Sequence, residues 1–466
     1  MAIQPIRSMK VCIVGAGMGG LACALALAKE GFENIEVYET ASSLGFVGAG
    51  IQLAPNMSRI LDRLGVWKEI EAEAVILRDT SIRGTDSRFQ RLAYEGNFGT
   101  NDEIEGATDK ELGHVDLAYI EETYKYPHMV GHRHSLANGL YNGCLKEKSI
   151  KFYFKTAVQD VASFGPKPTF TAAPRDGKPY SVTCDILLAS DGIKSVARVA
   201  MLKDLGVTAD IVDSHSAAYR IMLNRSQMES DPELLALIEH EGVNRWIGER
   251  RHIIAYPVSN KQIYNMSTTQ PDVNFAAAPS ETYTTKGSKK AMLEVFGDFC
   301  PKVLRLLNLV PEGEVCEWKL RIHEPLPTWI HGSVALVGDA CHPTLPHMAQ
   351  GAAQAIEDAA VLGAVLAQLP DSSPESVNKG LRVYEKIRKE RAEMLVELAA
   401  ASARGLHLGE GKAKEERDRQ FAELRAKGGK ATVPDKWADA DVQKIVYGVD
   451  CVKIAQEDFR DMYDNM

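Results

Sequence analysis

The chain has 466 residues, which exceeds the length that a single hydrophobic core usually supports. We therefore expect two domains with peripheral helices. Its formal net charge of −9 argues against a nucleic-acid-binding protein, because binding to phosphates requires clustered lysine and arginine. No apolar run reaches the roughly 18 residues of a membrane-spanning helix, so we expect no membrane span.

The cysteines and the N-terminus indicate a reducing compartment. Eight cysteines are few for this length, and none lie in a CxxC pair, which disfavours both a disulfide framework and a zinc site. We therefore expect no bound metal. The first nine residues lack the apolar stretch of a signal peptide. We expect a cytoplasmic protein.

A nucleotide-binding pattern opens the chain. Residues 9–14 form a β-type run, a helical pattern follows, and a second strand occupies residues 35–39. The motif GAGMGG and an acid at the end of the second strand supply Gly15, Gly17, Gly20 and Glu39. The first glycine makes a tight turn, the second lets backbone approach a pyrophosphate, and the third lets the helix pack on the strand. Because Glu39 can accept from a ribose hydroxyl, we expect a bound dinucleotide.

Two further segments suggest ligand contacts. In GAGIQLAPN, residues 48–56, Gly48 and Gly50 flank Ala49 before a helix, which suggests backbone lying against a flat ligand. Arg133 begins an amphipathic helix in GHRHSLANGL, where the helix dipole opposes a cation. It therefore either binds an anion or is an ordinary surface arginine pointing away. The flanking histidines have no third ligand nearby, so we expect no metal there.

The middle and end of the chain add a β-rich region and a second strand-to-helix junction. Residues 181–188 read as one buried strand, and alternating β segments fill residues 210–318. A buried strand then ends at Gly338-Asp339, and a loop leads to a helix at Gln350-Gly351. Free N–H groups at that helix start favour an anion. Helical periodicity runs from Pro374 to about Leu406, and the charged residues 410–430 predict a solvated helix and linker.

Three motifs in a fixed order carry a family resemblance: GAGMGG with Glu39, SDGIKSVAR at residues 190–198, and GDACHPTLPHMAQGAAQAIED at residues 338–358. Together they resemble the FAD-dependent aromatic hydroxylases, the class A flavoprotein monooxygenases. Tyr256-Pro257 followed by QIYNM is similar to their salicylate hydroxylase-like branch, and YGVD at residues 447–450 looks like the YGYD element of its fungal members.

The resemblance implies roles for individual residues. Gly15, Gly17, Gly20 and Glu39 would hold the ADP half of FAD, and Asp339 would bind the ribityl and pyrophosphate region. Arg133 would lie near the cofactor, and Asp191-Gly192 would serve both FAD and NAD(P)H. Pro346 and the turn at Gln350-Gly351 would border the isoalloxazine ring, and Gly50, Gly351 and Ala352 complete the implied cofactor site.

This sequence departs from the family pattern at two places. Residues 189–192 read ASDG where the family usually has GADG, which affects the expected backbone geometry. The basic residue that many members carry shortly after the ribose-binding acid is absent, so the choice between NADH and NADPH stays open.

The resemblance also implies a fold. We expect the α/β class: a Rossmann-like FAD-binding domain with a mostly β substrate domain and C-terminal helices. The FAD-binding domain would comprise residues 1–75, 115–205 and 325–405. The substrate domain would comprise residues 76–114 and 206–324, and residues 406–466 would form a C-terminal helical tail.

The implied reaction is hydroxylation by a flavin hydroperoxide, which forms from FAD, NAD(P)H and dioxygen. The resemblance implies a monomer or homodimer. A helix start at the flavin would stabilise its reduced anion. The substrate would be a phenol or another activated aromatic, with decarboxylation if it is a salicylate. A dearomatising hydroxylase or epoxidase of a polyketide-type or meroterpenoid substrate in secondary metabolism is the alternative. A non-enzymatic FAD-fold binding protein is a remote third.

Candidate substrate groups lie in SHSAAYRIML, residues 214–223. Strand alternation places His215 and Tyr219 on one face and Arg220 on the other. Arg220 could pair with a carboxylate or phenolate, and His215 or Tyr219 could relay a phenolic proton. A structural arginine and a core tyrosine are equally compatible with the pattern. His342 is expected to cap the cofactor loop, and weaker candidates for the substrate site are Trp246, His252, Tyr256 and His323.

Overall fold

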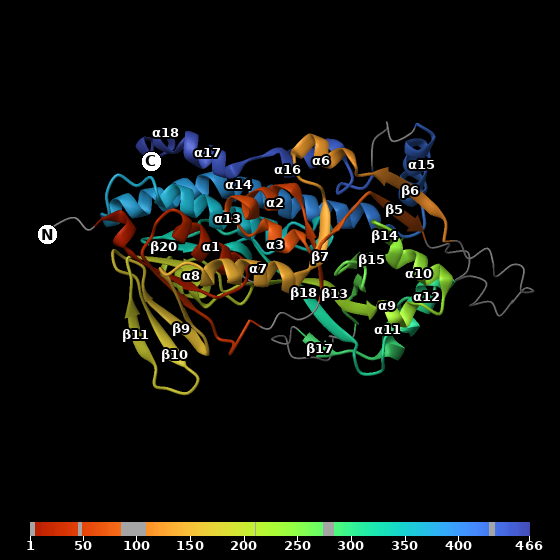
Figure 1. Cartoon of the computed structure of the whole chain (residues 1–466), viewed down its shortest axis with the longest axis horizontal. Coiled ribbons are helices and arrows are strands. Elements are labelled where there is room, and N and C mark those ends of the chain that lie inside the picture. The colour runs from red at the N-terminus through yellow and green to blue at the C-terminus, as the bar shows by residue number, and fades with distance from the viewer. Residues whose placement is uncertain (1–4, 45–48, 85–108, 210, 274–283, 428–433) are drawn as a thin grey trace, which may run out of the picture.

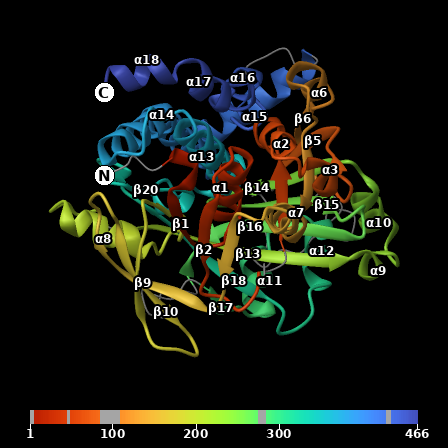
Figure 2. The same cartoon turned by 60° about the vertical axis from the view of Figure 1, so that its left-hand side comes forward.

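The computed structural model describes residues 5–44, 49–84, 109–209, 211–273, 284–427 and 434–466. Gly48 falls outside these ranges. Two large sheets lie next to each other, and a row of C-terminal helices runs along one side of the molecule (Figures 1 and 2). The α/β class expected from the sequence, with C-terminal helices, is confirmed.

The first sheet has six strands in the order β19-β20-β12-β1-β2-β8. Its strands are β1 (Lys10–Val14), β2 (Asn34–Tyr38), β8 (Ile150–Tyr153), β12 (Ile186–Ala189), β19 (Ile330–His331) and β20 (Val334–Leu336). All pairs are parallel except β19 with β20. The carboxyl ends of the parallel strands therefore meet at one edge, where open α/β sheets bind ligands.

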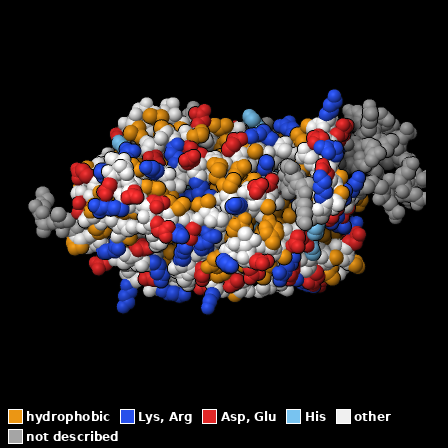
Figure 3. All heavy atoms as spheres, turned by 90° about the horizontal axis from the view of Figure 1, so that it is seen from above, with side chains coloured by type: hydrophobic (Ala, Val, Ile, Leu, Met, Phe, Trp, Pro, Cys, Tyr) orange, Lys and Arg blue, Asp and Glu red, His pale blue; other side chains and the backbone are white. Residues whose placement is uncertain are grey.

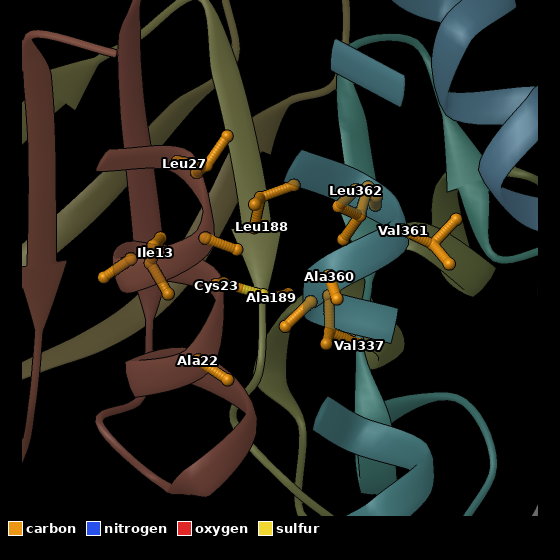
Figure 4. Close-up of a cluster of buried hydrophobic side chains, with 14 of the residues drawn as sticks. Ile13, Ala22, Cys23, Leu27, Leu188, Ala189, Val337, Ala360, Val361 and Leu362 are labelled. Carbon is orange, nitrogen blue, oxygen red and sulfur yellow. The ribbon is translucent and has the colours of Figure 1, made fainter. Parts of the chain in front are cut away.

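Three helices pack on this sheet: α1 (Met18–Lys29), α7 (Arg133–Leu145) and α13 (Gly351–Leu366). Small residues allow α1 and α13 to approach closely, and a Cβ added at Gly363 would lie 3.1 Å from the Ala26 Cβ. Figure 4 shows Cys23 and Leu27 with side chains of β12 and α13 in the shared core. This packing fixes the N-terminus of α13 against the sheet edge.

The second sheet has eight strands in the order β17-β18-β13-β16-β15-β14-β5-β6. They are β5 (Asp79–Gly84), β6 (Glu111–Asp116), β13 (Ile211–Asn224), β14 (Gly242–Gly248), β15 (Arg251–Val258), β16 (Ile263–Pro271), β17 (Thr284–Lys286) and β18 (Cys316–His323). A separate hydrophobic core includes Tyr219, Trp246 and Phe296 and is completed by α10 (Pro232–Glu239), α11 (Lys289–Val295) and α12 (Pro301–Asn308).

Two three-stranded sheets accompany the large ones. The first comprises β3 (Gly50–Leu53), β7 (Met129–His132) and β4 (Val75–Ile76), and the second comprises β9 (Thr156–Ser163), β10 (Thr169–Pro174) and β11 (Tyr180–Thr183). The single strand predicted at residues 181–188 is therefore wrong. The chain turns a corner at Asp185, whose carboxylate accepts from the Lys10 amide, so β11 and β12 join different sheets.

The C-terminal helices are α14 (Pro374–Leu406), α15 (Lys412–Ala426), α16 (Ala440–Gly448), α17 (Cys451–Glu457) and α18 (Phe459–Asp464). The charged run is not simply a solvated helix, because Phe421 of α15 is fully buried against Gly113 of β6. Asp435 is also buried, where it pairs with Arg245. The last 60 or so residues thus contribute to the core, and the domain boundaries stay a prediction.

The remaining short helices are α2 (Pro55–Arg63), α3 (Trp67–Glu71), α6 (Tyr119–Tyr124), α8 (Val196–Asp204) and α9 (Arg225–Met228), with 3-10 turns η1 (Ile6–Ser8), η3 (Gly338–Ala340) and η4 (Pro346–Met348). Acidic and basic side chains are interspersed on the face that Figure 3 shows. Among the described residues, no helix is both long and apolar enough to cross a membrane.

Candidate active site

A cavity of about 420 Å³ lies where the two large sheets meet. The parallel sheet contributes Gly17 and the loop from Gly338 to Ala355, and the eight-stranded sheet contributes Arg220 and Asn265. Gly50 of β3 lines it as well, and the Gly50 amide donates to the Asn265 side chain at 2.6 Å. Because the cavity joins a nucleotide-type loop to a second sheet, it can hold a cofactor and a smaller ligand together.

The three motif glycines occupy three different environments. Gly15 has φ of +92°, and a Cβ there would lie 2.4 Å from the carbonyl oxygen of Ser190. A Cβ at Gly20 would lie 1.9 Å from the Gly15 oxygen, whereas one at Gly17 would meet no atom within 4 Å. Gly15 and Gly20 are therefore required by the protein's own packing. Gly17 leaves open space at the start of α1, where a phosphate can approach.

Glu39 lies beside this loop and bonds to it. Its carboxylate accepts from the backbone N–H groups of Ala16, at 2.8 Å, and Ala41, at 2.7 Å. Each carboxylate oxygen has two lone pairs, so one remains on each for a ribose hydroxyl. The predicted ribose contact fits this geometry, and Glu39 also holds the loop in place.

Two aspartates have carboxylate oxygens without a donor among the described residues. Asp339 is surrounded by protein but accessible from the cavity, and burial raises the pKa of its carboxyl. Asp191 accepts from the Ala197 amide through Oδ2, while its Oδ1 is buried without a hydrogen bond, and burial raises its pKa too. A buried acceptor without a donor, such as Asp191 Oδ1, costs about 1–3 kcal/mol. Asp339 is open to the cavity, so a ligand there can donate hydroxyl groups to its carboxylate.

Two arginines bring positive charge into the cavity. Arg133, the first residue of α7, is largely buried, and burial lowers the pKa of its guanidinium, an effect that Asp339 partly offsets. Arg220 lies 4.5 Å above the Trp318 ring. Burial, with repulsion from Arg133, lowers the pKa of Arg220 to about 10. No carboxylate of the described residues forms an ion pair with Arg220, which makes it a receptor for an anionic ligand.

The start of α13 completes the cofactor side of the cavity. Pro346, Gly351 and Ala352 line it, together with Gly192, which has φ of +74°. The fully helical residues begin at Gly351, so the first N–H groups of α13 have no carbonyl partner within the helix. These groups and the helix dipole stabilise negative charge at this end of the cavity.

Two predicted substrate residues do not reach the cavity. Tyr219 is fully buried in the second hydrophobic core, where its ring packs against Phe296 at 6.5 Å. His215 is exposed, with φ of +52°, at a bulge between Asp213 and Ser216. The assignment of these two as proton relays is wrong, because the bulge breaks strand alternation at His215 and the Tyr219 face points to the helices. Likewise, His342 bonds to Asp358 at 2.6 Å rather than to carbonyls of its own loop.

Several residues that line the cavity were missed or undervalued by the sequence analysis: Gln52, His252, Ile254, Tyr256, Asn265, Ser267 and Thr269. Tyr256 and Asn265 lie within the YP and QIYNM elements, so the family resemblance pointed at their strands. Gln52 follows the GAG motif and accepts from the Trp437 indole at 3.0 Å. This contact and a hydrogen bond with His128 at 3.1 Å, both distant in the sequence, distinguish Gln52 from an ordinary strand residue.

Comparison with known proteins identifies the family. The family model described as "FAD binding domain" matches residues 8–399. The FAD-dependent monooxygenase atnJ of Arthrinium sp is 30% identical over 415 residues, which cover 88% of each chain. The 3-hydroxybenzoate 6-hydroxylase of Klebsiella oxytoca is 30% identical, with 84% of this chain and 87% of the relative covered. This chain belongs to the class A FAD-dependent monooxygenase family.

Solved structures of the same fold support the architecture of this FAD-dependent monooxygenase. A salicylate hydroxylase substrate complex matches with a TM-score of 0.73 and 22% identity, over 97% of this chain and 98% of that one. CtdE in complex with FAD and substrate 4 matches with a TM-score of 0.76 and 18% identity, over 98% and 99%. FAD is the cofactor, and the open space at Gly17 and the Asp339 carboxylate that lines the cavity fit it.

Proposed function

We propose that this monooxygenase uses NAD(P)H and dioxygen to hydroxylate a phenolic or otherwise activated aromatic substrate, whose phenolate or carboxylate binds Arg220. The observation that carries the proposal is the guanidinium of Arg220, which lines the cavity without an ion-pair partner among the described residues. A desolvated cation of this kind is costly unless a ligand supplies the opposite charge. Trp318 holds the guanidinium plane by stacking, which orients the bound anion.

The residues of the cavity divide the work between cofactor and substrate. Asp339 would accept from hydroxyl groups of the cofactor, and the start of α13 would favour negative charge on its ring. When bound, FAD takes reducing equivalents from NAD(P)H and supplies one oxygen atom of dioxygen to the ring. Arg220 favours the ionised form of a phenol, which is the electron-rich form that oxygen transfer needs. Apolar neighbours such as Ile254 limit water in the pocket.

The test is turnover by the purified, FAD-loaded protein against a panel of phenols, salicylates, hydroxypyridines and 3-hydroxybenzoate. We expect a yellow protein whose oxidation of NADH or NADPH is stimulated by at least one ring that carries an acidic group. Peroxide and product are measured together, so that coupled hydroxylation is distinguished from wasteful oxidation. A protein that cannot be loaded with FAD, or that no aromatic compound stimulates, contradicts the proposal.

The product distinguishes the phenol hydroxylase from the dearomatising alternative. A hydroxylated arene keeps its aromatic ultraviolet absorption, whereas a dearomatised or epoxidised product loses it. Release of carbon dioxide from salicylate would reveal decarboxylative hydroxylation. The cytoplasmic location and the monomer or homodimer state expected from the sequence stay predictions, and the remote alternative of a non-enzymatic protein is not retained because the chain is an FAD-dependent monooxygenase.

A further inference from the structure

Three histidines from three separate elements meet beside the cavity. They are His252 of β15, His347 of η4 and His407 at the end of α14. Their ring nitrogens lie within 4.8 Å of one another, and His252 Nδ1 is 2.5 Å from His407 Nε2. His347 packs edge-on against both, with ring centroids 5.3 Å and 5.5 Å away. The cluster is therefore a bonded pair of imidazoles with a third packed beside it.

The pair connects the substrate cavity to the outer part of the protein. His252 lines the cavity and is 5% exposed. His407 is only partly buried, because it lies where α14 ends and the chain turns towards α15. A smaller cavity of about 10 Å³, enough for one water, adjoins His347 and shares Pro346 and Ile254 with the large one. The geometry thus supplies a short polar route from the cavity to the end of α14.

The surroundings keep these rings neutral. Burial is the main cause that lowers the pKa of His347 to about 3 and of His407 to about 4, and it lowers the pKa of His252 well below its ordinary value. Arg245 adds to this for all three, and Arg417 adds to it for His407. Both arginines are themselves paired, with Asp435 and Asp418 respectively. A neutral imidazole has one donor and one acceptor nitrogen, so each ring can receive one proton while passing on another.

We propose that His252 and His407 carry the phenolic proton of the substrate from the cavity to solvent. The proposal rests on the proposed function, because it assigns the route by which the bound phenol ionises. The O–H bond of the phenol breaks and its proton binds Nε2 of His252. The proton on Nδ1 of His252 passes to Nε2 of His407, and the proton on Nδ1 of His407 passes to water. The phenolate keeps the electron pair and faces Arg220, and one proton leaves. After product release, water in the emptied cavity takes the proton from Nε2 of His252, His407 returns its Nε2 proton to Nδ1 of His252, and solvent water protonates Nδ1 of His407, which resets both rings.

A metal site is the competing reading of three neutral histidines. Bonds of about 2.0–2.1 Å at the tetrahedral angle would place two ligand nitrogens roughly 3.3 Å apart. The contact between His252 Nδ1 and His407 Nε2 is a hydrogen bond, which engages one of the two nitrogen lone pairs that an ion would need. The guanidinium groups of Arg245 and Arg417 also disfavour a further cation at this place.

The experiment follows ionisation of a chromogenic phenol, 4-nitrophenol, when it binds the oxidised, FAD-loaded full-length enzyme. The buffer is held below the pKa of the probe, so that phenolate absorption appears only on binding. In rapid mixing we expect His407→Ala to form phenolate at least roughly 10-fold more slowly than the wild type, with a dissociation constant within about twofold. Added imidazole should restore the rate, which a purely structural role of His407 would not allow.

Two further variants complete the test. His407→Gln should be slow and should not respond to imidazole, because its side chain fills the space. His331→Ala is the matched control, since His331 is also partly exposed and bonds to Asp204 outside the cavity, and its rate should equal that of the wild type. FAD content measured on every variant reports folding.

The outcomes separate the two proposals. If the wild type ionises the probe and turns over an aromatic substrate but His407→Ala is equally fast, the relay is wrong while the proposed function stands. Slow ionisation in His407→Ala that imidazole does not restore also rejects the relay. One equivalent of tightly bound zinc in the wild type would reject it too, since the nitrogens would then be ligands. A wild type that no aromatic compound stimulates removes both proposals.

Discussion

Two groups of charged side chains lie in or beside the same stretch of chain, yet their environments are opposite. In the first, Glu357 and Asp358 of α13 bond to Arg388 of α14 at 2.5 and 2.8 Å, all fully buried. In the second, Asp339 and Arg220 face the cavity and form no ion pair with the described residues. The pKa values show the contrast: the pKa of Asp358 is lowered to about 2, whereas the pKa of Asp339 is raised.

The comparison shows how to separate structural charges from functional ones in this protein. Desolvation raises the pKa of both aspartates, but at Asp358 the charges of His342 and Arg388 more than offset it. At Asp339 the same kinds of neighbour, His342 and Arg133, do not. A buried charge whose cost the protein offsets supports the fold. A charge whose desolvation cost the protein does not offset is maintained for a ligand, and the ligand supplies the missing partner.

Removing the paired arginine should give the largest effect. Arg388→Met removes the cation that Glu357 and Asp358 share and leaves Arg391 and His342 as their remaining partners. We expect a loss of about 3–5 kcal/mol in the free energy of unfolding. Urea unfolding of the FAD-loaded protein measures it. The matched control is Arg382→Met on the same helix, where an exposed arginine is 3.9 Å from Glu385 and the expected loss is about 0–1 kcal/mol. Equal losses in the two variants would contradict a structural role for the buried cluster.

The same cluster predicts a pH dependence of stability. The pKa values of Glu357 and Asp358 are lowered to about 2, from ordinary values of 4.5 and 3.8. A carboxyl whose folded-state pKa is lowered contributes stability that is complete above its unfolded-state pKa and is lost as the pH falls through the folded-state pKa. We therefore expect unfolding free energy to decline between about pH 4.5 and 2. A flat profile over this range would show that the pKa values of the two carboxyls do not differ between the folded and unfolded protein.

Removing the cavity arginine should affect catalysis and leave the fold intact. We expect Arg220→Ala to lose about 2–5 kcal/mol of transition-state stabilisation, which is roughly 30-fold to several-thousand-fold in kcat/KM, because a desolvated anion loses its partner. Substrate-stimulated NAD(P)H oxidation measures it. Arg220→Lys keeps the positive charge but lacks the planar guanidinium, so its kcat/KM should lie between those of the wild type and Arg220→Ala. FAD content should stay unchanged, and an unaltered kcat/KM would exclude Arg220 from substrate binding.

The sequence could predict the cofactor half because its signals are local. Gly15, Gly17 and Gly20 lie within six residues, and the packing that requires Gly15 and Gly20 involves the adjacent turn and strand end. The helix that begins at Gly351 was visible from its apolar pattern and the preceding proline-containing loop. Both motifs could be recognised within a short segment, although the contact that requires Gly15 is with Ser190, far away in the sequence.

The substrate half depends on contacts that no short segment contains. His252 meets His407, which lies 155 positions later, and Gln52 meets Trp437 across 385 positions. The bulge at His215 also reversed the expected direction of the strand's side chains before Ser216. Arg220 was placed correctly on the opposite face from Tyr219 because the strand is regular beyond the bulge. Alternation therefore predicts faces only within an unbroken ladder.

Removing the aspartate that lacks a donor should weaken cofactor binding. We expect Asp339→Ala to lose about 1.5–3 kcal/mol in FAD binding, roughly 10-fold to 150-fold in Kd, since hydrogen bonds to a charged acceptor have this strength. Fluorescence titration of FAD into the cofactor-free protein measures it. Asp160→Ala, at an exposed position of β9, is the control and should match the wild type. If the Asp339 variant bound FAD with wild-type affinity, Asp339 would have no role in cofactor binding.

The smallest effect should come from the tyrosine next to Arg220 in sequence. Tyr219 lies in the core between the sheet and the helices, so Tyr219→Phe should change kcat/KM by less than about twofold while costing about 1 kcal/mol in unfolding free energy. Arg220→Ala reverses this pattern, with a large catalytic loss and unchanged FAD binding. If Tyr219→Phe instead slowed turnover without loss of stability, the face of β13 assigned to the core would have to take part in the reaction, and the separation of structural from functional positions along this strand would fail.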